Sequence, residues 1–167
     1  MDWKILVRNS KYNRLVVIAG LVVLVDQLSK AIILKRLPLH HSIPVIPGFF
    51  DITFIFNPGG AFGFLAGQPS ILRHVFFLGV TSMAICFIFI LYRKIPQTHS
   101  LLANAFALII GGAVGNLIDR VRFEKVVDFL DFYLGKHHWP AFNVADSAIS
   151  VGMAIFVYHL IFNKIPD

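Results

Sequence analysis

The sequence predicts an all-α membrane protein, a bundle of four transmembrane helices with one small β-structured insert. Three observations lead to this fold class. Hydrophobic residues make up 57% of the 167-residue chain and charged residues only 14%. The apolar residues gather in long blocks near the length that crosses a bilayer, whereas a soluble core would alternate apolar with polar positions. A stretch rich in proline and glycine separates the first two blocks. We treat residues 1–167 as a single integral membrane domain.

The four apolar blocks predict four transmembrane helices, at about residues 15–34, 71–92, 101–118 and 145–162. Basic residues precede the first block, as in a secretory signal peptide. That block is nevertheless too long for a signal-peptide core, carries Asp26 and Lys30, and is followed by no small-residue cleavage site. We therefore expect the first helix to be retained. Small residues in the third block, Gly111, Gly112 and Gly115, permit close packing between helices.

Residues 35–70 form the predicted insert, which interrupts the hydrophobic pattern with five prolines and five glycines. Aromatic and β-branched residues over 49–56 predict a strand, and the sequence Asn57-Pro58-Gly59-Gly60 predicts a turn. We expect a short sheet at one membrane face. Its aromatic surface, with Phe62 and Phe64 beyond the turn, suits a lipid-bearing substrate. An ordinary interfacial aromatic belt is the alternative interpretation.

Four helices place both termini on one side of the membrane, with residues 35–70 and 119–145 on the other. Lysine and arginine are divided evenly between the two sides, so the basic cluster before the first helix decides the orientation. We predict that both termini lie in the cytoplasm and that both inserts lie outside it. Six polar residues then converge near the outer boundary and suggest a single site: Asp26, Asn57, Asn116, Asp128, Asn143 and Asp146.

Two aspartates are the main candidates for chemistry. Asp128 and Asp146 both lie among apolar residues, and no other Asp, Glu, Lys or Arg occurs between Asp146 and Phe162. Ionisable residues at membrane positions usually mark functional sites, and two that meet can share one proton. The structural alternative for Asp146 is an N-cap of the last helix, a role open equally to Asn143. The two roles are compatible.

Other polar residues have a structural and a functional interpretation. Asp26 and Lys30 are four residues apart, so they share a helix face and can pair, either to orient the helix end or to support the site. Asn116, Asp119 and Arg120 also share a face. For Asp119 alone, an ordinary ion pair with Arg120 at the helix end is the favoured interpretation.

Several classes of site are disfavoured by composition. Cys86 is the single cysteine, which rules out a disulfide within the chain and a thiolate metal cluster. The seven histidines are scattered and suggest no metal centre. The net charge of +6 flanks apolar blocks and forms no basic stripe with interleaved aromatics, so we expect no nucleic-acid partner. Nothing in the sequence calls for a cofactor.

Five segments resemble the motif blocks of bacterial lipoprotein signal peptidase (signal peptidase II), in the family's order and across nearly the whole chain. They are residues 25–30 (VDQLSK), 56–62 (FNPGGAF), 111–120 (GGAVGNLIDR), 126–129 (VVDF) and 141–147 (AFNVADS). One departure from the family pattern occurs in the second block, where Pro58 follows Asn57 and Gly60 replaces an alanine. This departure bears on loop flexibility and substrate detail.

The resemblance implies an inner-membrane aspartic endopeptidase with four transmembrane helices and an extracytoplasmic β-cradle. Such enzymes cut prolipoproteins just before a cysteine that carries a diacylglyceryl group, so the implied partners are that substrate and membrane lipid. The motif match makes Asp128 and Asp146 the catalytic pair. It assigns supporting or substrate-binding positions to Asp26, Asn57, Gly112, Asn116, Asp119, Arg120 and Asn143.

Two other functional classes compete with a peptidase. A small proton-coupled transporter would use Asp26, Asp128 and Asp146 as a proton relay. The sequence shows no paired halves with matching interrupted helices, and the acids cluster at one face without lining a path across the membrane. A structural scaffold would leave the boundary carboxylates and amides without a purpose. We therefore favour the peptidase.

Overall fold

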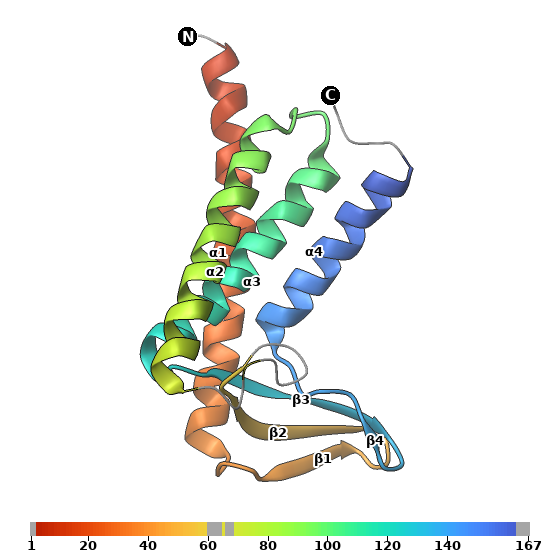
Figure 1. The fold of residues 1–167 in the computed structure, drawn as a ribbon. Helices are drawn as coiled ribbons and strands as arrows, with labels where there is room; N and C mark the ends of the chain where they lie inside the picture. The colour runs from red at the N-terminus through yellow and green to blue at the C-terminus, as the bar shows by residue number, and fades with distance from the viewer. Residues whose placement is uncertain (1–2, 60–64, 66–68, 163–167) are drawn as a thin grey trace.

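A computed structural model describes residues 3–59, 65 and 69–162. Its helices form an elongated bundle, and its strands form a sheet across one end of that bundle (Figure 1). The start of the first helix (Trp3–Arg36) and the end of the last helix (Val144–Ile161) lie at the opposite end of the bundle from the sheet. Gly60, Phe62 and Phe64, which the sequence analysis placed in and after a turn, lie outside the described residues.

Four helices of the described chain are long and apolar enough to cross a membrane. They are α1 (Trp3–Arg36), α2 (Ser70–Lys94), α3 (Ser100–Phe123) and α4 (Val144–Ile161). The four predicted blocks each fall on one of these helices. Helix α1 begins well before the predicted residue 15, because the basic residues ahead of the apolar block continue the same helix.

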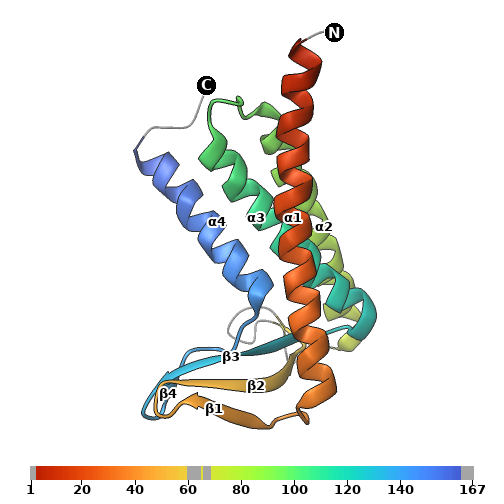
Figure 2. The same ribbon diagram turned by 180° about the vertical axis from the view of Figure 1, so that it is seen from behind.

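Helix α3 is the centre of the bundle and packs against the three other helices (Figure 2). Close approach depends on its glycines, as the sequence predicts. A Cβ at Gly111 would lie 2.9 Å from the main chain of Ala19 in α1, and a Cβ at Gly112 would overlap the carbonyl oxygen of Ala145 in α4. Side chains on the outer faces of α1 and α2 are exposed and apolar, among them Val16, Ile71 and Met83, as a lipid-facing surface requires.

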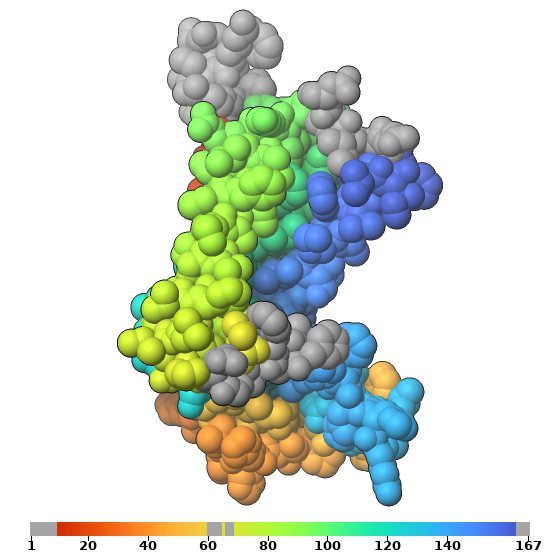
Figure 3. Space-filling model, viewed as in Figure 1, coloured from red at the N-terminus to blue at the C-terminus, as the bar shows by residue number. Residues whose placement is uncertain are grey.

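The sheet has four antiparallel strands in the order β1-β2-β3-β4: β1 (Ser42–Ile46), β2 (Phe50–Asn57), β3 (Val126–Leu134) and β4 (His137–His138). Strand β2 confirms the strand predicted over 49–56. The sheet is wider than the predicted insert, because β3 and β4 come from the segment between α3 and α4. In the space-filling view the sheet forms a separate layer below the helices (Figure 3).

A small core joins the sheet to the end of α1. Ile33 of α1 and Leu37, which follows that helix, pack with Phe54 of β2 and with Val127 and Phe129 of β3, all nearly buried. Burial of such side chains contributes about 1.5–3 kcal/mol each. This core fixes β3 beside the bundle, so that the residue between Val127 and Phe129, Asp128, is held where the helices meet the sheet.

Candidate active site

A cavity of about 570 Å³ lies where α3, α4 and the sheet meet. Its lining includes five residues that the sequence analysis selected as site candidates: Asn57, Asn116, Arg120, Asp128 and Asp146. They come from β2, α3, β3 and α4, which are distant in the sequence. Apolar and small side chains of α4 and of the 139–142 segment complete the wall. Four of the six residues predicted to converge, Asn57, Asn116, Asp128 and Asp146, therefore line one cavity.

Asp128 and Asp146 reach this cavity from different kinds of element. Asp128 lies on β3, opposite Ile55 of β2, and its side chain is 3% exposed. Asp146 lies in the first turn of α4 and is partly buried. A rigid strand and a helix start therefore hold the two carboxylates, which favours a fixed geometry over a mobile one.

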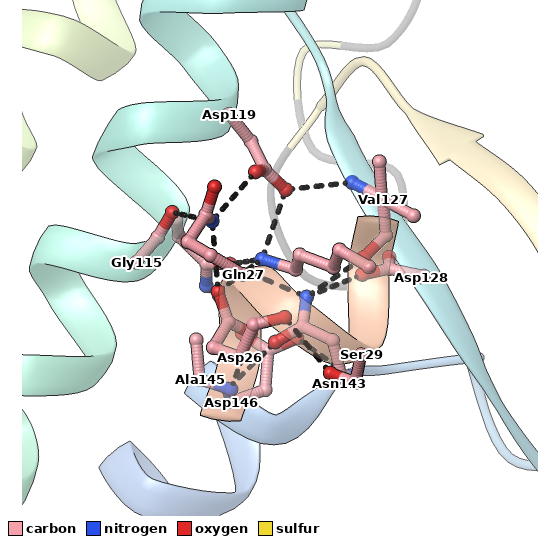
Figure 4. A network of polar contacts seen from close by, with 12 residues as sticks. Asp26, Gln27, Ser29, Gly115, Asp119, Val127, Asp128, Asn143, Ala145 and Asp146 are labelled. Carbon is pink, nitrogen blue, oxygen red and sulfur yellow. Dashed lines mark hydrogen bonds and ion pairs between the residues drawn. The ribbon is translucent and has the colours of Figure 1, made fainter. Parts of the chain in front are cut away.

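Asn143 connects the two aspartates (Figure 4). Its side-chain nitrogen donates to Oδ1 of Asp128 at 2.7 Å, and its backbone N–H donates to Oδ2 of Asp146 at 3.3 Å. The backbone N–H of Asp146 in turn donates to Oδ1 of Asn143 at 2.9 Å. This reciprocal pair is a capping box with Asn143 as the N-cap. Asp146 is therefore not the N-cap, and its other carboxylate oxygen faces elsewhere in the site.

Three asparagine amides are held in one orientation each by groups that can only donate a hydrogen bond. Oδ1 of Asn57 accepts from the backbone N–H of Gly59 at 3.0 Å, and Oδ1 of Asn116 accepts from the Lys30 ammonium at 3.0 Å. Oδ1 of Asn143 accepts from a backbone N–H, as described above. Each amide must then present its NH₂ group to the other side.

These three NH₂ groups donate hydrogen bonds to the two aspartates. Nδ2 of Asn57 lies 3.0 Å from Oδ2 of Asp128, and Nδ2 of Asn116 lies 2.7 Å from Oδ1 of Asp146. With Asn143 on Oδ1 of Asp128, both carboxyl groups receive donors from neutral side chains. The arrangement solvates the pair without adding a positive charge in direct contact.

Burial, first, and the nearby charge of Asp146, second, raise the pKa of Asp128 to about 7. Hydrogen bonds from Asn57 and Asn143 act against this rise. A carboxyl group with this pKa holds a proton near neutral pH, which an ordinary aspartic acid does not. One member of the pair is thus ready to act as an acid.

Behind the cavity lies a buried ion cluster of Asp26, Lys30 and Asp119. Lys30 lies 2.9 Å from Asp26 and 2.8 Å from Asp119, and all three side chains are at most 2% exposed. Asp26 also accepts the backbone N–H of Ala145 at 3.0 Å, and Asp119 accepts that of Val127 at 3.0 Å. The cluster therefore fixes the residues next to Asp146 and Asp128. Asp26 thus has both roles that were considered for it, pairing and support.

The favoured interpretation of Asp119, an ordinary pair with Arg120, is wrong. Asp119 pairs with Lys30 from α1, and Arg120 turns away to donate from Nη2 to the carbonyl oxygen of Gly59 at 3.0 Å. The Arg120 guanidinium also lies over the Phe77 ring of α2, 4.1 Å from its centre. Tertiary contacts with α1 and the 57–59 turn explain the difference, since spacing along one helix cannot show them.

Gly112 supports the site from a distance. It does not line the cavity but lies against Ala145 and Ile149 of α4, so it sets how closely α4, and with it Asp146, approaches α3. The candidate site residues thus divide into those that line the cavity and those behind it, the latter being Asp26, Gly112, Asp119 and Asn143.

Lys30 and Gln27 belong to the site's support but were not among the candidate site residues. Gln27 donates to Gly115, Asp119 and Asp26 (Figure 4). The signal for Lys30 was present in the sequence as a lysine inside an apolar helix, four residues after Asp26. Within the described residues, no group of three or more His, Cys, Asp or Glu side chains is placed to hold a metal ion.

Comparison with known proteins agrees with this geometry. A family model described as signal peptidase (SPase) II matches residues 18–162. A lipoprotein signal peptidase of Desulforapulum autotrophicum is 57% identical over 92% of this chain and 95% of its own length. The corresponding protein of Syntrophus aciditrophicus is 50% identical over 86% of this chain and 89% of its own.

A solved structure gives the same result for the fold. A bacterial membrane enzyme, determined by the in meso method at 2.3 Å resolution, has a TM-score of 0.81 to this chain. The two are 34% identical, and the match covers 90% of this chain and 88% of that one. The matched segment, residues 18–162, contains both aspartates and all the supporting residues described above. This chain belongs to the signal peptidase II family.

Proposed function

We propose that this chain removes signal peptides from prolipoproteins as an aspartic endopeptidase, with Asp128 and Asp146 as its catalytic pair. The observation that carries the proposal is that these two carboxylates line one cavity and are bridged by Asn143. The relatives that match most of the chain are lipoprotein signal peptidases, which supports the same substrate class here.

The proposed reaction begins with one shared proton on the pair. The ionised carboxylate removes a proton from a water molecule, and the resulting hydroxide attacks the carbonyl carbon of the scissile peptide. The protonated carboxyl group then gives its proton to the leaving amine as the carbon–nitrogen bond breaks. The raised pKa of Asp128 favours it as the proton donor. Asp146, which accepts N–H groups from Asn116 and Asn143, is then the base.

The neutral amides around the pair suit this chemistry. A positive side chain in direct contact would lower the pKa of a carboxyl group and remove the shared proton. Amide donors instead hold each carboxylate in place, and although those from Asn57 and Asn143 lower the pKa of Asp128, it stays raised at about 7. Donors fixed before the reaction need no rearrangement as charge develops, which is the main electrostatic advantage of an enzyme site.

The proposed substrate enters from the membrane. The cavity wall continues along α4 through Ile149, Ser150 and Val151, and the last two are exposed on the helix surface, where lipid would lie. We place the cut just before a cysteine that carries a diacylglyceryl group, and its acyl chains in the surrounding lipid. We also place both termini in the cytoplasm of a bacterium and the sheet at the extracytoplasmic face of the inner membrane.

The direct test is cleavage of a diacylglyceryl-modified prolipoprotein peptide by the purified protein in detergent, with a chelator in excess. Mass spectrometry of the products locates the cut. We expect a cut before the lipid-bearing cysteine. A folded protein that leaves the peptide intact would contradict the proposal, and proton-coupled flux in proteoliposomes would then be measured for the transporter alternative.

A further inference from the structure

We propose that Lys30 is a positioning residue for peptide hydrolysis, acting through Asn116 on Asp146. The proposal rests on the proposed function. Lys30 does not line the cavity, and its side chain is 2% exposed, so it has no route to substrate. Its effect on the reaction must therefore pass through another residue.

All three N–H groups of the Lys30 ammonium have an acceptor. Two are the carboxylates of Asp26 and Asp119, at 2.9 and 2.8 Å. The third is Oδ1 of Asn116, at 3.0 Å. Charge neutralisation alone accounts for the first two contacts, since a buried carboxylate needs a partner. It does not account for the third, which links the ion cluster to the catalytic cavity.

The contact with Lys30 decides which way the Asn116 amide faces. An asparagine amide can turn over and exchange its oxygen and its NH₂ group. If Asn116 turned over, its NH₂ group would face the ammonium and its oxygen would face Oδ1 of Asp146, so both contacts would become repulsive. Asn143 also donates to Oδ1 of Asn116, at 3.2 Å. The charge-assisted bond from Lys30 is the shorter and the stronger of the two.

The orientation matters because Asn116 provides the 2.7 Å hydrogen bond to Asp146. The other donor to that carboxyl group, the backbone N–H of Asn143, is at 3.3 Å. Loss of the short bond would leave Asp146 free to rotate away from the attacking water. A misplacement of about 1 Å can lower a rate about 100-fold. We expect the loss to fall on kcat, with KM unchanged.

A purely structural role for Lys30 is the competing explanation, because its contact with Asp119 joins α1 to α3. The two roles can be separated by a charge-matched cycle. Lys30→Met alone would leave two buried carboxylates without a cation, so each measurement is made in an Asp119→Asn background. The double variant K30M/D119N removes one positive and one negative charge together and keeps the net charge of the cluster.

The rate of single-turnover cleavage of the diacylglyceryl peptide is measured for every variant in the Asp119→Asn background. The cycle compares the loss of rate caused by Lys30→Met when Asn116 is present with the loss caused when Asn116 is replaced by alanine. With Asn116 present we expect kcat to fall about 100-fold. In the Asn116→Ala background we expect less than about a 3-fold further loss, because the residue through which Lys30 acts is gone. Equal losses in both backgrounds would overturn the proposal. Lys30→Leu, which also has no hydrogen-bond donor, replaces Lys30→Met, with the same expectation, if the methionine variant is not recovered folded.

Tyr92→Phe is the control for a lost tertiary contact of α1 away from the site. The buried Tyr92 hydroxyl of α2 donates to the carbonyl oxygen of Lys11 in α1 at 2.7 Å, and neither residue lines the cavity. We expect a lower unfolding temperature with kcat within about 3-fold of wild type. If Tyr92→Phe lowers kcat as strongly as K30M/D119N, Lys30 is only structural. If the unmodified enzyme does not cleave, the proposed function fails; if it cleaves and K30M/D119N matches Asp119→Asn, only this inference fails.

Discussion

The side-chain nitrogen of Asn143 lies 2.7 Å from Oδ1 of Asp128, although Asn143 is also the N-cap of α4. Asn143 therefore caps the helix that carries Asp146 and also holds Asp128 by a hydrogen bond. Its side chain is fully buried, so neither role involves contact with bulk water. The start of α4 and the geometry of the pair cannot be changed independently at this position.

Substitutions at Asn143 separate these two roles. Serine is as good an N-cap as asparagine but has no NH₂ group to offer Asp128, whereas alanine loses both functions. Both variants lose the bonds of the buried NH₂ group, so the cap alone separates them, and we expect Asn143→Ala to be about 1 kcal/mol less stable than Asn143→Ser. Both should lower kcat about 10-fold, since each removes the hydrogen bond from Nδ2 that orients Asp128, and a loss of about 1.4 kcal/mol is a factor of ten in rate. Thermal unfolding and peptide cleavage measure the two effects. Wild-type kcat in Asn143→Ser would show that the amide contact is unimportant.

The pH dependence of cleavage follows from the raised pKa of Asp128, about 7. Below this pH the pair keeps its shared proton, and above it the proton is lost, so that no acid remains for the leaving amine. We expect kcat/KM to fall as pH rises above about 7, with a slope of one proton. The control is Asp131→Asn, on the same strand but outside the cavity lining. This variant should show the same fall in kcat/KM at high pH. A flat profile from pH 6 to 9 would contradict the assignment.

The contact of Gly112 with α4 predicts a steric effect on the site. A Cβ at this position would overlap the carbonyl oxygen of Ala145 and lie 2.8 Å from Ile149. Gly112→Ala should destabilise the protein by about 1–3 kcal/mol and lower kcat, because α4 carries Asp146. At Gly79 of α2 nothing lies within 4 Å of an added Cβ. Gly79→Ala should therefore be neutral or slightly stabilising. Equal unfolding temperatures for the two variants would show that the helix contact is loose.

The proposed orientation in the membrane predicts which loops a reagent can reach. In a Cys86→Ser background, Lys136→Cys places a thiol at the β3–β4 turn, and Lys94→Cys places one at the end of α2. Both native residues are exposed. In intact spheroplasts, a membrane-impermeant maleimide should label the first variant and not the second. Labelling of Lys94→Cys alone would show that the chain has the opposite orientation in the membrane.

Much of this fold could be predicted because its signals are local. Uninterrupted apolar blocks mark α2 and α4, and the aromatic run before Asn57 marks β2. Polar residues at helix ends, such as Asn116 and Asp146, were predicted to converge because an even number of helices returns the chain to the same membrane face. Length and polarity alone carry that information.

Contacts between distant segments were harder to predict from the sequence. The pairing of β3 with β2 joins residues far apart in the sequence, such as Asp128 with Ile55. Spacing on one helix suggested Asp119 with Arg120, yet Lys30 of α1 is the partner that packing brings to Asp119. The contacts of Lys30 with two carboxylates and an amide depend on how α1 and α3 cross. No periodicity in either helix specifies that crossing.

The central claim is that Asp128 and Asp146 act together on the peptide bond, and amide substitutions test it most directly. Asp128→Asn and Asp146→Asn keep the shape of each side chain and remove its proton chemistry. Single-turnover cleavage of a diacylglyceryl-modified prolipoprotein peptide would be measured for both variants, with thermal unfolding to show that each is folded. We expect each variant to lose at least about 100-fold in rate, since acid–base groups contribute about 10²–10⁴-fold each. A folded variant that cleaves at the wild-type rate would contradict the account.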